Sequence, residues 1–211
     1  MDGVLVDNMT VHLEAFAGIT RRYGVCYDAE ATLGMAGKGN DEIFEALFPA
    51  AIVENVGPRA LGEEKEALYR ELYAPKLVPI PGLIEFLGEL KAAGIRIAVG
   101  TSAPTANLDF VFDGLGIRRY FDVIVNADMV TRCKPDPEIY QVAVAKLGLL
   151  PGECLVFEDA AAGIQAARAA GVKVVALSTT LNKPVLEKIP GIALIISDFT
   201  EINIDRSKAL V

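Results

Sequence analysis

The chain has 211 residues, of which 52% are hydrophobic, and its formal net charge is −8. This length and apolar content are enough to bury a sizeable core. The negative charge argues against nucleic acid or an anionic membrane surface as the main partner, because both require a basic protein face. No apolar run approaches the roughly 18 to 20 residues that span a bilayer, so we expect a soluble globular protein.

The three cysteines, Cys26, Cys133 and Cys154, are too few and too scattered for a disulfide framework, and no two of them form a Cys-x-x-Cys pair. The N-terminus carries Asp2 and Asp7 in place of the basic region of a secretory signal. These features favour the reducing cytoplasm as the location of the protein.

Residues from about 8 to 79 show helical patterns and no convincing strand. The proline-rich stretch at 75–81 predicts a stiff connector that leads into a new helix at Leu83. Helices are predicted for three segments before that connector: Thr10–Tyr23, Asp41–Leu47 and Glu63–Tyr73.

From Gly94 onward, short β-rich apolar runs alternate with amphipathic stretches, the pattern of βα units and a parallel sheet. Continuous hydrophobicity in the runs indicates strands that are buried on both faces. The predicted strands are Ile95–Val99, Val123–Asn126, Cys154–Phe157, Val172–Ala176 and Ala193–Ile196. The predicted helices between them are Thr105–Leu115, Pro137–Leu147 and Ala160–Ala170. We therefore predict an α/β, Rossmann-like core (residues 1–7 and 80–211) with an inserted α-helical bundle (residues 8–79).

Polar residues follow several predicted strands, and in a parallel sheet the carboxyl ends of strands share one edge. In isolation, Thr101 and Asp159 could cap the helices after them, and the Lys-Pro-Asp-Pro segment could be a loop that opens a helix. Together, a hydroxyl, a lysine and paired carboxylates in this order form a set that binds a phosphate and a divalent cation. The residues in question are Asp2, Thr101, Ser102, Lys134, Glu158 and Asp159.

The order of these motifs and the residues within them resemble those of the haloacid dehalogenase superfamily along the whole chain. Lys-Pro-Asp-Pro followed 24 residues later by Glu-Asp-x-x-x-Gly is similar to the β-phosphoglucomutase and phosphatase branch, whose helical cap is inserted after the first motif. The matching segments are Asp2-Gly3-Val4-Leu5-Val6-Asp7, Ala98-Val99-Gly100-Thr101-Ser102, Lys134-Pro135-Asp136-Pro137 and Phe157-Glu158-Asp159-Ala160-Ala161-Ala162-Gly163.

The resemblance implies a role for each motif. Glu158, Asp159 and the backbone carbonyl of Asp2 would hold Mg²⁺, a hard cation that prefers oxygen ligands. Thr101 and Lys134 would hold the transferring phosphoryl group. Asp2 would be the general acid/base, in a reaction that passes through an aspartyl-phosphate.

The family's first motif begins with the nucleophilic aspartate, two residues before the acid/base. On this alignment the nucleophile would stand immediately before Met1. The strand that carries it would be central, between the strands that lead to Thr101 and Glu158, and without it two rows of backbone groups would lack partners. We therefore expect the chain that starts at Met1 to fold poorly or to be inactive, compared with a form that extends upstream.

The helical insert supplies further candidates for substrate binding. His12 matches a family histidine at this spacing from Asp2, with a bystander role as the equal alternative. The segment from Gly34 to Asn40 could be a substrate loop or a flexible interhelical loop, and it is no Walker A motif. In the alignment with the family, Asn40 occupies the position of an arginine that binds the second phosphate, and Lys38 lies two residues earlier. Lys65 matches a substrate-facing lysine, but its acidic neighbours favour a solvated helix face.

These observations favour a Mg²⁺-dependent phosphatase that acts on a small phosphorylated metabolite, such as a sugar phosphate. The alternatives are a β-phosphoglucomutase that interconverts glucose 1- and 6-phosphate, and a relative that lacks the nucleophile and only binds phosphate. The substitution of the arginine by Asn40 counts against the mutase. A monomer or weak dimer is expected.

Overall fold

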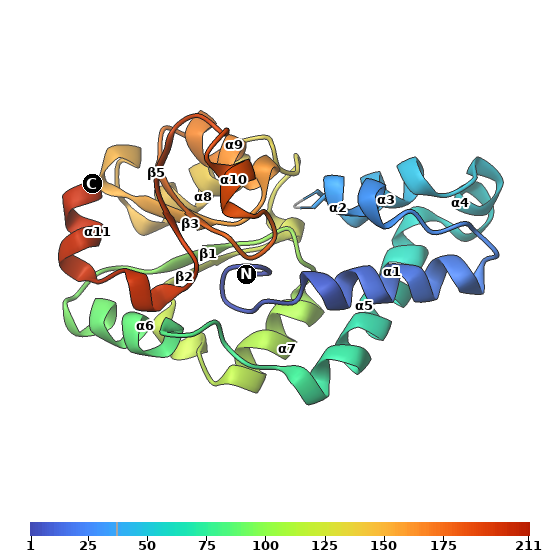
Figure 1. Ribbon diagram of the computed structural model, residues 1–211, viewed down its shortest axis with the longest axis horizontal. Coiled ribbons are helices and arrows are strands. Elements are labelled where there is room, and N and C mark those ends of the chain that lie inside the picture. The colour runs from blue at the N-terminus through green and yellow to red at the C-terminus, as the bar shows by residue number, and fades with distance from the viewer. Residues whose placement is uncertain (37) are drawn as a thin grey trace.

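A computed structural model describes residues 1–36 and 38–211 of the chain. The molecule has an α/β part that contains every described strand and a helical part that projects from one end of it (Figure 1). Of the predicted loop from Gly34 to Asn40, residues 34–36 and 38–40 lie in the helical part, and Gly37 is outside the described residues. The α/β class predicted from the sequence is confirmed.

Among its described residues, the helical part has five α-helices with their own hydrophobic cluster. Pro58 occupies the first turn of the last helix, a position where its missing N–H costs nothing, so this helix begins five residues before the predicted Glu63. The helices are α1 (Met9–Arg22), α2 (Ala29–Gly34), α3 (Asn40–Leu47), α4 (Ala50–Val56) and α5 (Pro58–Tyr73), followed by a short 3₁₀ turn, Ala74–Lys76. The cluster consists of Phe16, Ile19, Ile43, Phe44, Phe48 and Leu61.

The strands of the α/β part are all parallel and form two separately hydrogen-bonded sheets, β1–β2 and β3–β4–β5. The segment before α1 forms a tight turn, in which the Leu5 amide donates to the Met1 carbonyl at 2.7 Å and Asp2 bridges to Val6. The strands are β1 (Ala98–Gly100), β2 (Val123–Val125), β3 (Leu155–Glu158), β4 (Lys173–Leu177) and β5 (Ile192–Ile196).

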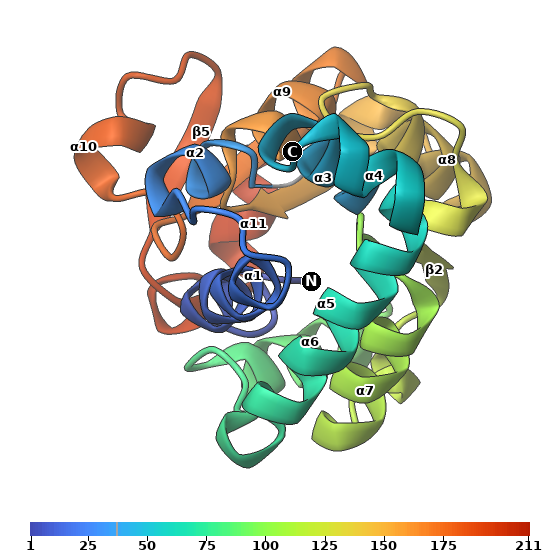
Figure 2. The ribbon, with the colours of Figure 1, turned by 90° about the vertical axis from the view of Figure 1, so that its right-hand side faces the viewer.

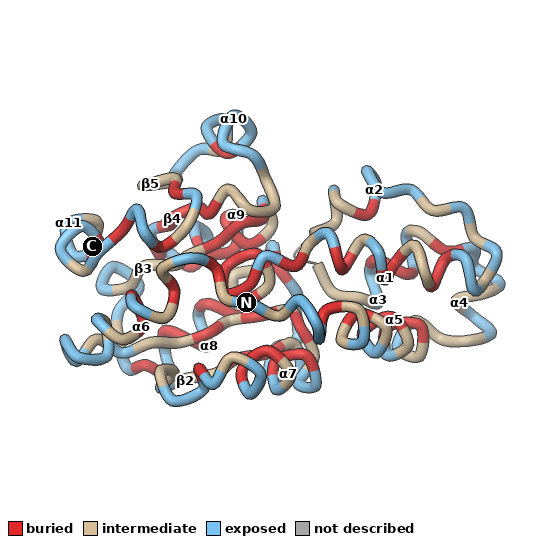
Figure 3. Tube along the Cα trace, turned by 60° about the horizontal axis from the view of Figure 1, so that its bottom comes forward, coloured by how far each residue is buried: buried red, intermediate tan, exposed pale blue. Residues whose placement is uncertain are grey.

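Helices cover both faces of these sheets. Along β4, Val175 belongs to one hydrophobic cluster and Val174 to another, so successive side chains are buried on opposite faces. The burial colouring of Figure 3 shows that β4 is buried along most of its length. This confirms the two-sided burial predicted from the continuous apolar runs. The helices are α6 (Leu83–Ala92), α7 (Thr105–Leu115), α8 (Glu138–Leu147), α9 (Ala161–Ala169), α10 (Lys183–Leu186) and α11 (Ile204–Leu210).

The helical part is joined to the α/β part by packing as well as by the chain. Val11 of α1 and Tyr69 and Tyr73 of α5 are buried in the same cluster as Phe112 of α7. Figure 2 shows α5 passing beside α7. Across the described part of the chain, we find no helix with the length and apolar content needed to cross a membrane.

Candidate active site

The ten residues singled out in the sequence line one cavity between the two parts of the molecule. The carboxyl ends of β1 and β3 form its floor, and α1, α3 and α5 form its opposite wall. The ten are Asp2, His12, Lys38, Asn40, Lys65, Thr101, Ser102, Lys134, Glu158 and Asp159. The structure therefore brings together residues that are up to 157 positions apart, from Asp2 to Asp159.

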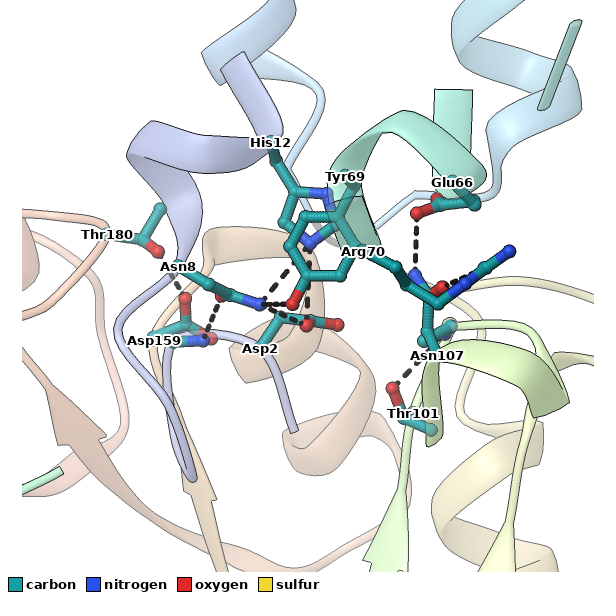
Figure 4. Close-up of polar contacts among 12 residues, drawn as sticks. Asp2, Asn8, His12, Glu66, Tyr69, Arg70, Thr101, Asn107, Asp159 and Thr180 are labelled. Atoms are coloured by element: carbon teal, nitrogen blue, oxygen red, sulfur yellow. Dashed lines mark hydrogen bonds and ion pairs between the residues drawn. The ribbon is translucent and has the colours of Figure 1, made fainter. Parts of the chain in front are cut away.

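Asp2 is held by donors from the start of α1. Asn8 Nδ2 donates to Asp2 Oδ1 at 2.6 Å, and His12 Nε2 lies 3.5 Å from the same oxygen (Figure 4). Burial raises the pKa of Asp2, but the hydrogen bonds from His12 and Asn8 more than offset this, so the pKa falls well below its ordinary value. The Asp2 side chain is 24% exposed and faces the cavity as a carboxylate.

Asn8 was not predicted from the sequence as a functional residue. This side chain is fully buried and connects Asp2 to Tyr69, whose hydroxyl accepts from Asn8 Nδ2 at 2.7 Å. Asn8 also precedes the first turn of α1, where asparagine is common, so the sequence offered only a helix-start signal for it.

Lys65 is buried, which corrects the expectation of a solvated helix face. Its side chain is 3% exposed, and its Nζ lies 3.0 Å from His12 Nδ1, while the His12 ring stacks on Tyr69 at 4.0 Å. Leu61, Lys65 and Tyr69 follow one another at four-residue intervals on α5, so Lys65 shares their buried stripe. That spacing was the signal that could have placed it.

Glu66 is a second functional residue that the sequence did not reveal. It lines the cavity with a side-chain exposure of 7%. Oε1 accepts from Lys65 Nζ and from Asn40 Nδ2, both at 2.8 Å, and Oε2 accepts from Asn107 Nδ2 at 2.6 Å. Burial raises the pKa of Glu66, but the charge of Lys65 outweighs burial and the pKa falls below its ordinary value.

Thr101 stands at the carboxyl end of β1 and is 2% exposed. Its Oγ1 accepts from the Ala103 amide at 3.1 Å, which leaves the hydroxyl proton to donate to a neighbouring group. The helix-cap alternatives for Thr101 and Asp159 are wrong, because Pro104 precedes α7 and Ala160 precedes α9 at the cap positions. Ser102 follows Thr101 in the cavity lining.

Lys134 and the two carboxylates after β3 form a buried charge cluster. Lys134 Nζ donates to Glu158 Oε1 at 2.5 Å, and the Tyr140 hydroxyl donates to the same oxygen. Burial opposes ionisation of Glu158, but Lys134 overcomes this and lowers its pKa to about 2. Burial and the adjacent Glu158 charge raise the pKa of Asp159 to about 7, although the Thr180 hydroxyl donates to it.

This cluster suits a divalent cation. Burial and, after it, the charge of the adjacent Glu158 raise the pKa of Asp159, and a bound cation would offset both effects. The surrounding backbone leaves the carboxylates room: a Cβ atom at Gly3 would lie 1.9 Å from Asp159 Oδ2. Within residues 1–36 and 38–211, no three His, Cys, Asp or Glu side chains group as a metal site, so Glu158 and Asp159 would need a ligand of another kind to complete one.

The fold and the site define a class of α/β hydrolase that handles phosphate. The family described as haloacid dehalogenase-like hydrolase matches residues 1–171, and the chain belongs to that family. The chain is 35% identical over 176 residues to fructose-1-phosphate phosphatase YqaB of Escherichia coli (strain K12), covering 83% of this chain and 92% of the relative.

Two further proteins are similar along nearly the whole chain. Validoxylamine A 7'-phosphate phosphatase of Streptomyces hygroscopicus subsp. limoneus is 32% identical over 210 residues, which cover 96% of this chain and 93% of the relative. The crystal structure of a HAD hydrolase, family IA, variant 3, from Entamoeba histolytica superposes with a TM-score of 0.88 at 26% identity, over 100% of this chain and 96% of that one. The fold and the family predicted from the motifs are confirmed.

Proposed function

We propose that this protein is a Mg²⁺-dependent phosphatase that hydrolyses a small phosphorylated metabolite, most simply a sugar phosphate. One observation carries the proposal: Thr101, Lys134, Glu158 and Asp159 meet at the strand ends and face a single cavity. Relatives named as phosphatases of fructose 1-phosphate and of validoxylamine A 7'-phosphate support a phosphorylated carbohydrate as the substrate.

We assign the binding of the scissile phosphate to Thr101 and Lys134. The Thr101 hydroxyl is oriented by the Ala103 amide and can donate to a phosphate oxygen. Lys134 Nζ is held by Glu158 at 2.5 Å and adds a positive charge on the floor of the cavity. Donors that are fixed before the substrate arrives stabilise the charge that develops on a transferring phosphoryl group without a reorganisation cost.

We assign Mg²⁺ to Glu158, Asp159 and the backbone carbonyl of Asp2. When bound, the ion would neutralise charge on the phosphoryl oxygens. Asp159 gives the stronger support for this assignment. Burial and the charge of Glu158 hold its pKa at about 7, and a bound cation would favour its ionised form.

We assign proton transfer to Asp2. Its carboxylate reaches the cavity, and the donors Asn8 and His12 fix its orientation. A carboxylate placed in this way exchanges a proton with the ester oxygen of the substrate and with water, which are the two oxygens that change protonation during hydrolysis.

We further propose that residues 8–79 act as a cap domain over a core made of residues 1–7 and 80–211. The separate hydrophobic cluster around Phe44 supports this division. The cap would contact the part of the substrate that is distant from the scissile phosphate, with His12, Lys38, Asn40 and Lys65 in its wall and Ser102 opposite them. We place the protein in the cytoplasm, where the free thiols of its three cysteines would remain reduced.

The test is release of inorganic phosphate from a panel of metabolite monophosphates. We expect release that needs Mg²⁺, stops with a chelator, and is lost in Asp159→Asn. Turnover that persists without a divalent cation, or that survives Asp159→Asn, would contradict the assignment.

A further inference from the structure

Each lysine among the described residues that line the cavity is paired with a carboxylate. Lys134 is paired with Glu158 at 2.5 Å and Lys65 with Glu66 at 2.8 Å. Lys38 is paired with Glu42 four residues further on. No described arginine lines the cavity. The positive charge of each of these lysines is therefore compensated by a carboxylate directly beside it.

The three pairs are divided between the floor and the helical wall of the cavity. Lys134 is on the floor, beside the strand ends that hold the scissile phosphate in the proposed function. Lys38 and Lys65 belong to the helical wall, and their partners Glu42 and Glu66 come from α3 and α5 of the same wall. These two pairs together have no net charge. The floor differs, because it also has the Thr101 hydroxyl and the carboxylates that we assign to Mg²⁺, so we place the phosphate there.

Glu66 is fixed more firmly than a surface partner would be. It accepts hydrogen bonds from Lys65, Asn40 and Asn107, and its side chain is 7% exposed. Asn107 comes from α7 of the α/β part and is itself held by Arg70, whose guanidinium donates to Asn107 Oδ1 at 2.6 Å (Figure 4). Glu66 therefore cannot swing away to release Lys65 without breaking contacts to both parts of the molecule.

This arrangement has a consequence for the distant end of the substrate. A second phosphate against the helical wall would lose hydration, would meet no uncompensated cation, and would be repelled by the Glu66 carboxylate. An uncharged polyol would instead find hydrogen-bonding groups on Asn40, Glu66 and His12. Both effects favour a ligand that carries its charge at one end only.

We infer that the site selects singly phosphorylated, otherwise uncharged polyols and rejects bisphosphates, and that Glu66 is the residue that sets this selectivity. The inference rests on the proposed function for the location of the scissile phosphate. It is separable from that function, because selectivity can be read from binding alone.

The test compares a hexose 1-phosphate with the corresponding hexose 1,6-bisphosphate by calorimetric binding in the presence of Mg²⁺. The unaltered protein should bind the monophosphate at least about tenfold more tightly. Glu66→Gln has nearly the same shape and frees the charge of Lys65, so it should reduce that preference by about tenfold. Glu63→Gln, on the exposed face of the same helix, is the matched control and should leave the preference unchanged.

A second variant keeps the inference testable if Glu66→Gln does not fold. Glu42 is half exposed, so Glu42→Gln should fold normally and should shift the preference in the same direction by freeing Lys38. Tighter binding of the bisphosphate by the unaltered protein, no measurable binding of the monophosphate, or an unchanged preference in a folded Glu66→Gln variant would overturn the inference. If Glu66→Gln does not fold, an unchanged preference in Glu42→Gln would overturn it. Failure to release phosphate while the binding preference holds would contradict the proposed function only.

Discussion

Gly163 lies so close to Glu158 that a Cβ atom on the glycine would stand 2.1 Å from the carboxylate carbon. Gly163 is the third residue of α9, so the first turn of this helix passes directly over the buried carboxylate. Real Cβ atoms do not approach a neighbour so closely. The glycine is therefore required by the position of Glu158, although glycine is a poor residue for a helix.

Gly163→Ala should destabilise the protein by about 1–3 kcal/mol, because Glu158 would have to leave its position beside Lys134 to avoid the new methyl group. Gly88 of α6 is the matched control, since a Cβ there meets nothing within 4 Å. Gly88→Ala should be neutral or should gain up to about 1 kcal/mol of helix propensity. Urea unfolding measures both changes. An equal gain in the two variants would contradict the close packing of Gly163 against Glu158.

The contributions of Lys134 and Glu158 to the free energy of unfolding should depend strongly on each other. Lys134→Met leaves the Glu158 carboxylate buried without its charge partner, a change that costs about 3–5 kcal/mol. Adding Glu158→Gln removes that charge, so the double variant should be more stable than Lys134→Met alone. Phosphatase activity should be absent from both variants. A double variant whose loss equals the sum of the two single losses would show that the pair is not coupled.

The sequence alone predicted the helices and strands that local patterns of apolar and polar residues encode. The limits of α7 match the prediction residue for residue, and each predicted strand from 95 onward corresponds to an observed one with small shifts at its ends. Continuous apolar runs and strand-end polar residues are strong local signals, because both are imposed by a two-sided parallel sheet. The same signals named Thr101, Ser102, Lys134, Glu158 and Asp159. The site residues of the helical part were named only from the resemblance to the family; they are His12, Lys38, Asn40 and Lys65.

The residues that join the two parts of the molecule could not be predicted in this way. Glu66 lies in an acidic stretch that is typical of a solvated helix, and its burial depends on contacts with Asn40 and Asn107. Those partners are distant in sequence, so no local pattern encodes the contacts. The short helices α2 and α4 were also missed, because short helices in such a bundle depend on packing more than on propensity.

The Thr101 hydroxyl should contribute to phosphate binding. Thr101→Val keeps the shape of the side chain and removes the donor, so it should weaken the binding of inorganic phosphate by about 10- to 100-fold, the value of one hydrogen bond to a charged group. Thr101→Ser retains the hydroxyl and is the matched control, with affinity expected within a few fold of the unaltered protein. Calorimetric titration with Mg²⁺ present measures both. Equal affinity of the valine and serine variants would remove Thr101 from the binding site.

The contribution of Glu66 to stability should depend on pH in a defined direction. Although burial opposes it, the charge of Lys65 holds the pKa of Glu66 below the ordinary 4.5, so the folded protein binds this proton less tightly than the unfolded chain does. The stabilisation is therefore fully present above about pH 4.5 and is lost as the pH falls through the lower folded value. Glu66→Gln should cost about 1–3 kcal/mol near pH 7, because it leaves Lys65 buried without its partner, and the difference should shrink below about pH 4.5.

The measurement is the free energy of unfolding of both proteins from about pH 3.5 to 7.5, with Glu63→Gln as the control for loss of an exposed carboxylate on the same helix. The control should differ from the unaltered protein by less than about 0.5 kcal/mol throughout. A difference between Glu66→Gln and the unaltered protein that stays constant down to the lowest pH, or that grows as the pH falls, would show that Glu66 is not the ionised partner of Lys65 in the folded state.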